Sequence, residues 1–134
     1  MMRYKPLLIL TFLLVSATAA QSPKEQPETI MATFRAKPGN ETALQSLIEF
    51  HWTTARRLNA IRPELHVTVR GTEENDRTYF VHIFTWRDAR IPDAAPPEIR
   101  SIWDRMNTMV EARNGHPGIE FVEVSSVVPQ VPAR

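Results

Sequence analysis

The sequence predicts a single α+β domain in which one antiparallel sheet carries two helices. The first observation is a stretch at residues 77–87 that is β-branched or aromatic almost throughout and contains neither Gly nor Pro, which is typical of a strand. The second is a pair of longer stretches, near residues 41–59 and 97–114, with apolar residues at helical spacing. The third is a set of shorter strand-like stretches that flank and separate the two helical ones.

The first twenty residues have the features of a secretory signal peptide. Two basic residues give a positive start, an apolar segment covers residues 7–15, and small residues at 17–20 suit a signal peptidase. The segment is too short to form a stable membrane-spanning helix. We therefore expect a periplasmic or secreted protein whose mature chain begins at Gln21 or Ala20, with no membrane partner after cleavage.

The mature chain is close to neutral. Removing residues 1–20 takes away two basic residues and leaves 14 basic against 15 acidic ones, a formal net charge of −1. This balance does not favour a nucleic acid or an anionic membrane as a partner. The chain has no cysteine, which excludes disulfides, thiol catalysis and a lipid-modified N-terminal cysteine.

The first half of the domain, which we expect to span residues 29–128, predicts a strand and a helix. Residues 21–28 are polar and contain two prolines, as a flexible lead-in does, and residues 29–35 follow as the first strand. Asn40 is positioned to cap the helix at residues 41–59. One stripe of that helix is apolar apart from a single histidine, and its members are Leu44, Leu47, Ile48, His51, Ala55 and Leu58.

Residues 65–70 predict a second strand that forms a hairpin with residues 77–87. If the turn is centred on Glu74, His66 lies opposite His82 on a face that mixes aromatic and polar side chains. The other face of the hairpin is apolar in this register. Its predicted pairs are Val69 with Tyr79, Val67 with Val81 and Leu65 with Ile83.

The second half predicts a proline-rich loop, a helix and a last strand. The loop covers residues 88–97, and Pro97 suits the first turn of the helix. We expect the helix to end near Gly115, followed by a strand at 119–128 and a tail at 129–134. The apolar stripe of this helix consists of Ile99, Ile102, Trp103, Met106, Met109 and Val110.

This order of elements predicts a ferredoxin-like βαββαβ fold. Right-handed crossovers place both helices on one face of the sheet and the first and third strands at its centre. The strand at 77–87 is apolar on both faces, yet the helices cover only one of them. We therefore expect a second copy of the chain to cover the other face and to close a dimeric α/β barrel. The predicted interface residues are Leu65, Val67, Val69, Tyr79, Val81 and Ile83.

Three segments resemble the dimeric α/β-barrel superfamily and, within it, the antibiotic biosynthesis monooxygenase (ABM)-like domains. They are residues 36–41 (AKPGNE) before the first helix, 83–88 (IFTWRD) at the end of the third strand and 97–103 (PEIRSIW) at the start of the second helix. The resemblance covers roughly residues 29–128. It implies the fold more than the function, because oxygenases, haem-degrading enzymes, isomerases and other proteins share this fold.

The resemblance also implies a pocket between helices and sheet, lined in part by Trp86. Haem-degrading members carry an Asn on the first strand and a His near the second helix, whereas this chain has Ala32 and Pro96 at the corresponding positions. Cofactor-independent oxygenases of the family need fewer fixed residues, because the electron-rich substrate itself reacts with oxygen. The resemblance thus favours a protein without a cofactor, with haem as the alternative.

Two histidines are the candidate catalytic residues. His51 on the first helix and His82 on the third strand would act as a base or proton shuttle. The alternative is that both are hydrogen-bonded core residues. The four histidines share no metal-ligand spacing, and although His66 and His82 would meet across the hairpin, we predict no metal site.

Aromatic side chains near the predicted pocket are candidate contacts for an aromatic ligand, since indole and phenyl rings stack on such molecules and a Met side chain adapts to them. The alternative is that they fill the core between helices and sheet. The predicted substrate-binding residues are Trp52, Phe84, Trp86, Trp103 and Met106.

These patterns lead to three hypotheses about function. The first is an exported homodimer that binds a small aromatic or lipophilic molecule between helices and sheet, with cofactor-free oxygenation as its chemistry if it is an enzyme. The second is a ligand-binding or accessory protein without turnover. The third is a haem-binding or haem-degrading protein with His51 or His82 as the axial ligand.

Overall fold

The structure is a computed structural model that describes residues 25–64, 66–125 and 127. The predicted signal peptide, half of the predicted lead-in (21–24) and the predicted tail at 129–134 lie outside the described residues. The elements are β1 (Glu28–Arg35), α1 (Glu41–Arg57), β2 (Val67–Glu73), β3 (Arg77–Trp86), α2 (Pro97–Thr108) and β4 (Ile119–Glu123). No helix in the described part of the chain is long and apolar enough to cross a membrane.

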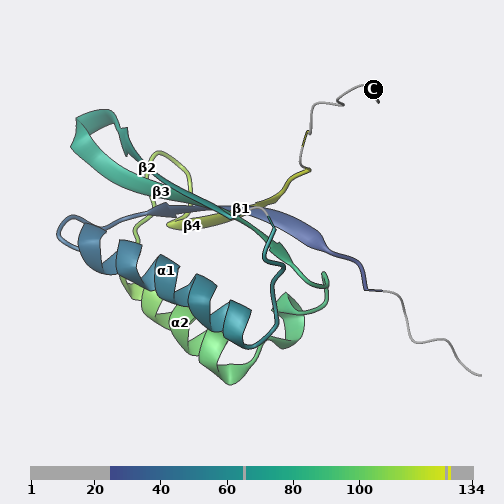
Figure 1. The fold of residues 1–134 in the computed structure, drawn as a ribbon. Helices are drawn as coiled ribbons and strands as arrows, with labels where there is room; N and C mark the ends of the chain where they lie inside the picture. Colours follow the sequence, from purple (N-terminus) through teal and green to yellow (C-terminus); the bar gives the residue numbers. More distant parts are fainter. Residues whose placement is uncertain (1–24, 65, 126, 128–134) are drawn as a thin grey trace, which may run out of the picture.

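The four strands form one antiparallel sheet in the order β2-β3-β1-β4. Both helices lie side by side against the same face of this sheet, and no helix or strand of the described residues covers the opposite face (Figure 1). The predicted ferredoxin-like order, the central position of the first and third strands and the one-sided placement of the helices are therefore confirmed.

The register of the β2–β3 hairpin differs from the prediction by two residues. Glu73 pairs with Arg77, so that the turn is centred on Asn75 rather than on Glu74. Asn75 and Asp76 have φ values of 63° and 58°, a left-handed conformation that short polar side chains tolerate. Because the shift is two residues, every side chain keeps its predicted face.

The corrected pairs follow from this shift. Val69 lies opposite Val81 and Val67 opposite Ile83, while Tyr79 lies opposite Gly71. The Tyr79 ring passes over Gly71 so closely that a Cβ atom there would lie 2.3 Å from it, which only glycine allows. The predicted partner His66 lies before the paired part of β2, which begins at Val67, and Leu65 is outside the described residues.

Helix ends also differ from the predictions. Helix α2 ends at Thr108 instead of near Gly115, and Val110 forms a β-bridge with Ala36. Val110 is buried and Met109 partly buried against the core, so the apolar pattern continues past the end of the helix. Helix α1 ends two residues earlier than predicted, since Asn59 has a φ of 56°.

Two smaller predictions are wrong. Asn40 occupies the N-cap position of α1, but its side chain makes no capping hydrogen bond. Instead the Glu41 carboxylate accepts a hydrogen bond of 2.8 Å from the backbone N–H of Gly39. The last strand is also shorter than the predicted 119–128, because β4 ends at Glu123.

The alternation along β3 separates core from open face. Its even-numbered residues from Thr78 to Trp86 are buried beneath the helices, whereas Tyr79, Val81 and Ile83 are only half-buried. Next to them on the same face, Val67 and Val69 are 39% and 49% exposed. This open face is the surface that the sequence predicts to meet a second copy, and the dimer itself stays a prediction.

Candidate functional site

A cavity of about 590 Å³ lies between the helices and the β1, β3 and β4 side of the sheet. This is the size range of small-molecule sites. Its walls are mostly apolar or aromatic. The lining residues are Glu28, Ile30, Phe34, His51, His82, Phe84, Trp86, Ala89, Pro92, Asp93, Trp103, Met106, Asn107, Ile119 and Phe121.

His51 enters the cavity from α1 and is hydrogen-bonded to the other helix. The indole Nε1–H of Trp103 on α2 donates to Nε2 of His51 at 3.0 Å. Because Nε2 accepts this hydrogen bond, the neutral ring carries its own hydrogen on Nδ1. Burial lowers the pKa of His51 from 6.5 to about 4, so this neutral form holds at physiological pH.

His82 enters the cavity from the middle of β3 and is 1% exposed. Among the described residues, neither Nδ1 nor Nε2 of His82 has a hydrogen-bond partner. Burial, together with the neighbouring His51 and His66, lowers the pKa of His82 from 6.5 to about 3. An unpaired buried imidazole costs folding free energy, so it is the polar group in this cavity that a ligand would satisfy.

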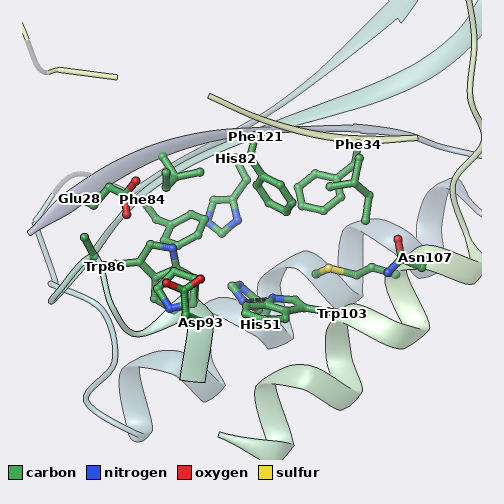
Figure 2. Close-up of a pocket in the computed structure, with 15 residues that line it drawn as sticks. Glu28, Phe34, His51, His82, Phe84, Trp86, Asp93, Trp103, Asn107 and Phe121 are labelled. Carbon is green, nitrogen blue, oxygen red and sulfur yellow. Dashed lines mark hydrogen bonds between the residues drawn. The ribbon is translucent and has the colours of Figure 1, made fainter. Parts of the chain in front are cut away.

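Three aromatic side chains form one side of the cavity. Phe84 and Trp86 project from β3 and contact edge to face, with ring centroids 5.0 Å apart and planes at 79°. Trp86 is likewise perpendicular to Trp103, at 6.1 Å and 87°. These side chains present both faces and edges of rings to the cavity (Figure 2), and Met106 adds a flexible apolar contact.

One end of the cavity is acidic. Glu28 at the start of β1 pairs with Trp86, and both residues line the cavity. The neighbouring Gln26 carbonyl accepts a hydrogen bond of 2.9 Å from Ala89, which holds the following loop against β1. That loop carries Asp93 in a 3-10 turn (Pro92–Ala94), at the same end of the cavity (Figure 2).

Six of the seven predicted site residues line this cavity: His51, His82, Phe84, Trp86, Trp103 and Met106. Trp52 does not. It stacks instead on His66, with ring centroids 3.8 Å apart and planes at 3°. The Trp52 ring centroid lies 6.4 Å from that of His82. The roles of the six lining residues stay predictions.

The geometry adds several lining residues that the sequence did not single out. Phe34 and Ile119 face each other across β1 and β4, and Ala32 pairs with Phe121 in the same register. Their alternation within strands predicted to face the helices was the available signal. Glu28 continues the same alternation at the start of β1, one residue before the predicted strand. For Asp93 and Asn107 the sequence held no such signal, because a loop and the helix packing bring them to the cavity.

Comparisons with known proteins agree on the fold. Neither protein-family models nor curated protein sequences give a match. SnoaB from Streptomyces nogalater, a cofactor-independent oxygenase, superposes with a TM-score of 0.56 at 15% identity, over 80% of this chain and 98% of its own. Rv0793 from Mycobacterium tuberculosis does so with a TM-score of 0.54 at 13% identity, over 79% and 100%.

A third solved structure, from Bacteroides thetaiotaomicron and named after the antibiotic biosynthesis monooxygenases, has a TM-score of 0.54 at 12% identity, over 81% of this chain and 96% of its own. This chain has the ABM-like fold. Sequence identities this low show the fold alone, so the resemblance seen in the sequence is confirmed for the fold.

Within this ABM-like fold, the cavity does not fit haem. His82 has free nitrogens that would suit an axial ligand, but His51 already accepts the Trp103 hydrogen bond. Haem also carries two propionates, and the charged side chains that line the cavity are the carboxylates of Glu28 and Asp93, with no Lys or Arg among the described lining residues. In the described part of the chain, no three His, Cys, Asp or Glu side chains are placed to hold a metal ion.

Proposed function

We propose that this protein is an exported homodimer that binds a small aromatic or lipophilic molecule in the cavity between helices and sheet. The observation that carries the proposal is the fully buried His82, whose two ring nitrogens have no partner among the described residues and which faces an aromatic cavity of about 590 Å³. Such a group needs either a water molecule or a ligand to satisfy it.

His82 would interact with the ligand as a neutral ring. With a pKa of about 3, it carries one N–H donor and one acceptor at physiological pH. It would therefore pair with an uncharged polar group such as a hydroxyl, while Trp86, Trp103 and Phe84 supply apolar contact. Removing an aromatic ligand from water provides most of the affinity, and the hydrogen bond orients it.

The homodimer would bury the open face of the sheet. Val67 and Val69 at one edge are substantially exposed, as is Val122 on β4 at 46%. Val81 and Ile83 lie between these positions on the central strand. A contiguous apolar surface of this kind is rare on monomers, and a second copy with the same surface matches it by symmetry.

For catalysis we propose cofactor-free oxygenation, in which an electron-rich aromatic ligand itself reduces dioxygen. One oxygen atom enters the product and the other leaves as water, with all electrons taken from the ligand. His82 is better placed than His51 to take a proton, because Trp103 occupies Nε2 of His51. A similar ABM-fold protein, SnoaB, is a cofactor-independent oxygenase.

A binding protein without turnover is the second candidate function. Its support is the low basicity of both imidazoles, whose pKa values are about 4 for His51 and about 3 for His82. A general base is most effective with a pKa near the working pH, so each ring would contribute little proton transfer unless the ligand changes its surroundings.

Calorimetric titration with 2-naphthol tests the binding site. We expect the wild-type protein to bind this neutral probe and Trp86→Ala to weaken the affinity about fivefold to tenfold, since a stacking surface is lost. Trp52→Ala is the matched control, because Trp52 lies outside the cavity. The absence of binding, or an equal loss in both variants, would show that the cavity is not the site.

Oxygen consumption with 1,4-dihydroxynaphthalene separates the two candidate functions. An oxygenase should consume oxygen above the rate without protein, and His82→Phe should reduce that excess about a hundredfold or more. A protein that binds 2-naphthol but leaves the oxygen rate at the background level is a binding protein.

A further inference from the structure

The two carboxylates at the acidic end of the cavity favour a positively charged ligand. We infer that the cavity takes an aromatic ligand that carries a protonated amine, and that the amine lies at the Glu28 and Asp93 end. This inference rests on the proposed function, because it assigns a chemical class to the ligand of the same cavity.

The electrostatic argument starts from the lining residues. Glu28 and Asp93 contribute two negative charges, and no Lys or Arg is among the described lining residues. His51 and His82 do not offset these charges, because burial keeps both rings neutral at physiological pH. The charges at this end are therefore of one sign, which favours a cation and opposes an anion.

Two arginines that follow Trp86 in the chain are already engaged. Arg90 donates hydrogen bonds to both carboxylate oxygens of Asp88, at 2.6 and 3.0 Å, and these bonds hold the pKa of that carboxyl well below its usual range. Arg87 donates to the backbone carbonyl of Asn59 at 2.9 Å. Neither guanidinium lines the cavity, so neither neutralises Glu28 or Asp93 there.

Strand register and loop hydrogen bonds hold Glu28 and Asp93 at this end of the cavity. The register of β1 and β3 places Glu28 beside the buried Trp86. Two hydrogen bonds of Gln26, its N–H to Asp88 at 3.0 Å and its carbonyl to Ala89 at 2.9 Å, fix the adjacent loop. Asp93 follows on that loop, and Figure 2 shows the three side chains of Glu28, Trp86 and Asp93 at one end of the cavity.

An ammonium group at this end would meet both carboxylates and an indole. Trp is the aromatic side chain that attracts a cation most strongly, and the attraction grows when water is excluded. An exposed acidic pair alone would not indicate a ligand. Here the same cavity also contains the unpaired, fully buried His82, which independently indicates one.

The opposite end of the cavity is uncharged, which gives the ligand a direction. Phe34 and the Asn107 amide lie there, away from Glu28 and Asp93 (Figure 2). A ligand with an amine at one end and an aromatic body at the other would place its rings beside Phe84 and Met106, within reach of His82.

Three matched probes test the inference by calorimetry at pH 7 and low salt. They are naphthalen-2-ylmethylamine, naphthalen-2-ylmethanol and 2-naphthoate, which have similar size and are cationic, neutral and anionic. We expect the amine to bind about tenfold more tightly than the alcohol, and 2-naphthoate to bind most weakly. Added salt at about 0.5 M should reduce the differences, since it screens charges near a cavity opening.

Charge-removing variants identify the responsible groups. In Glu28→Gln and in Asp93→Asn the ratio of amine affinity to alcohol affinity should fall about threefold each, and in the double variant it should approach one. Asp104→Asn is the matched control, because it removes the same charge from α2 outside the cavity and should leave the ratio as it is.

The outcomes separate the inference from the proposed function. If the alcohol binds while the amine binds no better, or if Glu28→Gln and Asp93→Asn leave the ratio unchanged, the cation inference is wrong and the cavity site stands. If none of the three probes binds, the proposed function is wrong, and the inference falls with it.

Discussion

The indole of Trp103 donates a hydrogen bond of 3.0 Å to the imidazole of His51, and this bond joins the two helices on the inside of the cavity. It ties one candidate catalytic residue to one candidate ligand contact. It also determines which nitrogen of His51 carries the proton, so that the ring cannot accept a second proton at Nε2 without losing its partner.

His51→Phe is the first prediction. It keeps a buried ring but leaves the Trp103 N–H without an acceptor, so the free energy of unfolding should fall by about 1–2 kcal/mol. Urea denaturation measures this change. The double variant with Trp103→Phe should lose less stability than the sum of the two single variants. A loss equal to that sum would show that the two side chains do not interact. We also expect ligand binding to persist in weakened form and any oxygenase activity to be lost, because Trp103 is then no longer held in place in the cavity wall.

His82→Phe should have the opposite effect on stability. The substitution removes two buried ring nitrogens that have no partner among the described residues, and a phenyl ring fits beside Phe84. We expect the free energy of unfolding to rise by about 1–2 kcal/mol at pH 7. His66→Phe, at an exposed ring, should change it by less than about 0.5 kcal/mol. A destabilised His82→Phe would mean that His82 has a structural partner.

Stability should depend on pH in a defined direction. The folded protein has pKa values of about 4 for His51 and about 3 for His82, against 6.5 for ordinary histidines. Below pH 6.5 these histidines therefore become protonated in the unfolded chain but stay neutral in the folded chain. The free energy of unfolding is at its full value above pH 6.5 and falls as the pH drops towards 4. The loss should reach the order of several kcal/mol.

Urea denaturation at a series of pH values between 7.5 and 4.5 measures this dependence. His82→Phe should make the free energy of unfolding less dependent on pH, because a histidine with a strongly lowered pKa is removed. Identical slopes in the wild type and the variant would remove His82 as a cause.

Val81→Asp tests the open face of the sheet. An unpaired carboxylate buried in a dimer interface costs several kcal/mol, which is of the order of the stability of a whole domain. Light scattering at micromolar concentration should give a dimer for the wild type and a monomer or aggregate for Val81→Asp. Ser101→Asp, on an exposed position of α2, should stay dimeric. A wild-type monomer would contradict the dimer.

Export is a prediction from the N-terminal sequence, which lies outside the described residues. Mass spectrometry of the protein from its native host should find a chain that begins at Gln21 or Ala20. A soluble cytoplasmic chain that retains Met1 would show that the segment is not a signal peptide.

The faces of the strands could be predicted from the sequence because side-chain direction alternates with a period of two. That alternation placed His82, Phe84 and Trp86 beneath the helices, where the structure has them. The hairpin register could not be predicted, since it depends on the left-handed conformation of Asn75 and on the close contact of Tyr79 with Gly71.

The cavity was predictable only in part. Its aromatic residues and Glu28 follow from strand and helix periodicity, but Asp93 does not. Asp93 lies on a loop that is held against β1 by hydrogen bonds of Gln26 across more than sixty residues, which no local pattern encodes. The His51–Trp103 bond likewise depends on how two helices pack, and two residues 52 positions apart give no sign of it in the sequence.

The most direct test of the cavity site is a crystal structure of the protein grown with 2-naphthol. We predict the naphthalene rings in contact with the indoles of Trp86 and Trp103, with the hydroxyl oxygen about 2.7–3.2 Å from a ring nitrogen of His82. A cavity that holds only water at a saturating concentration of the probe, or a probe bound elsewhere on the molecule, would contradict the account.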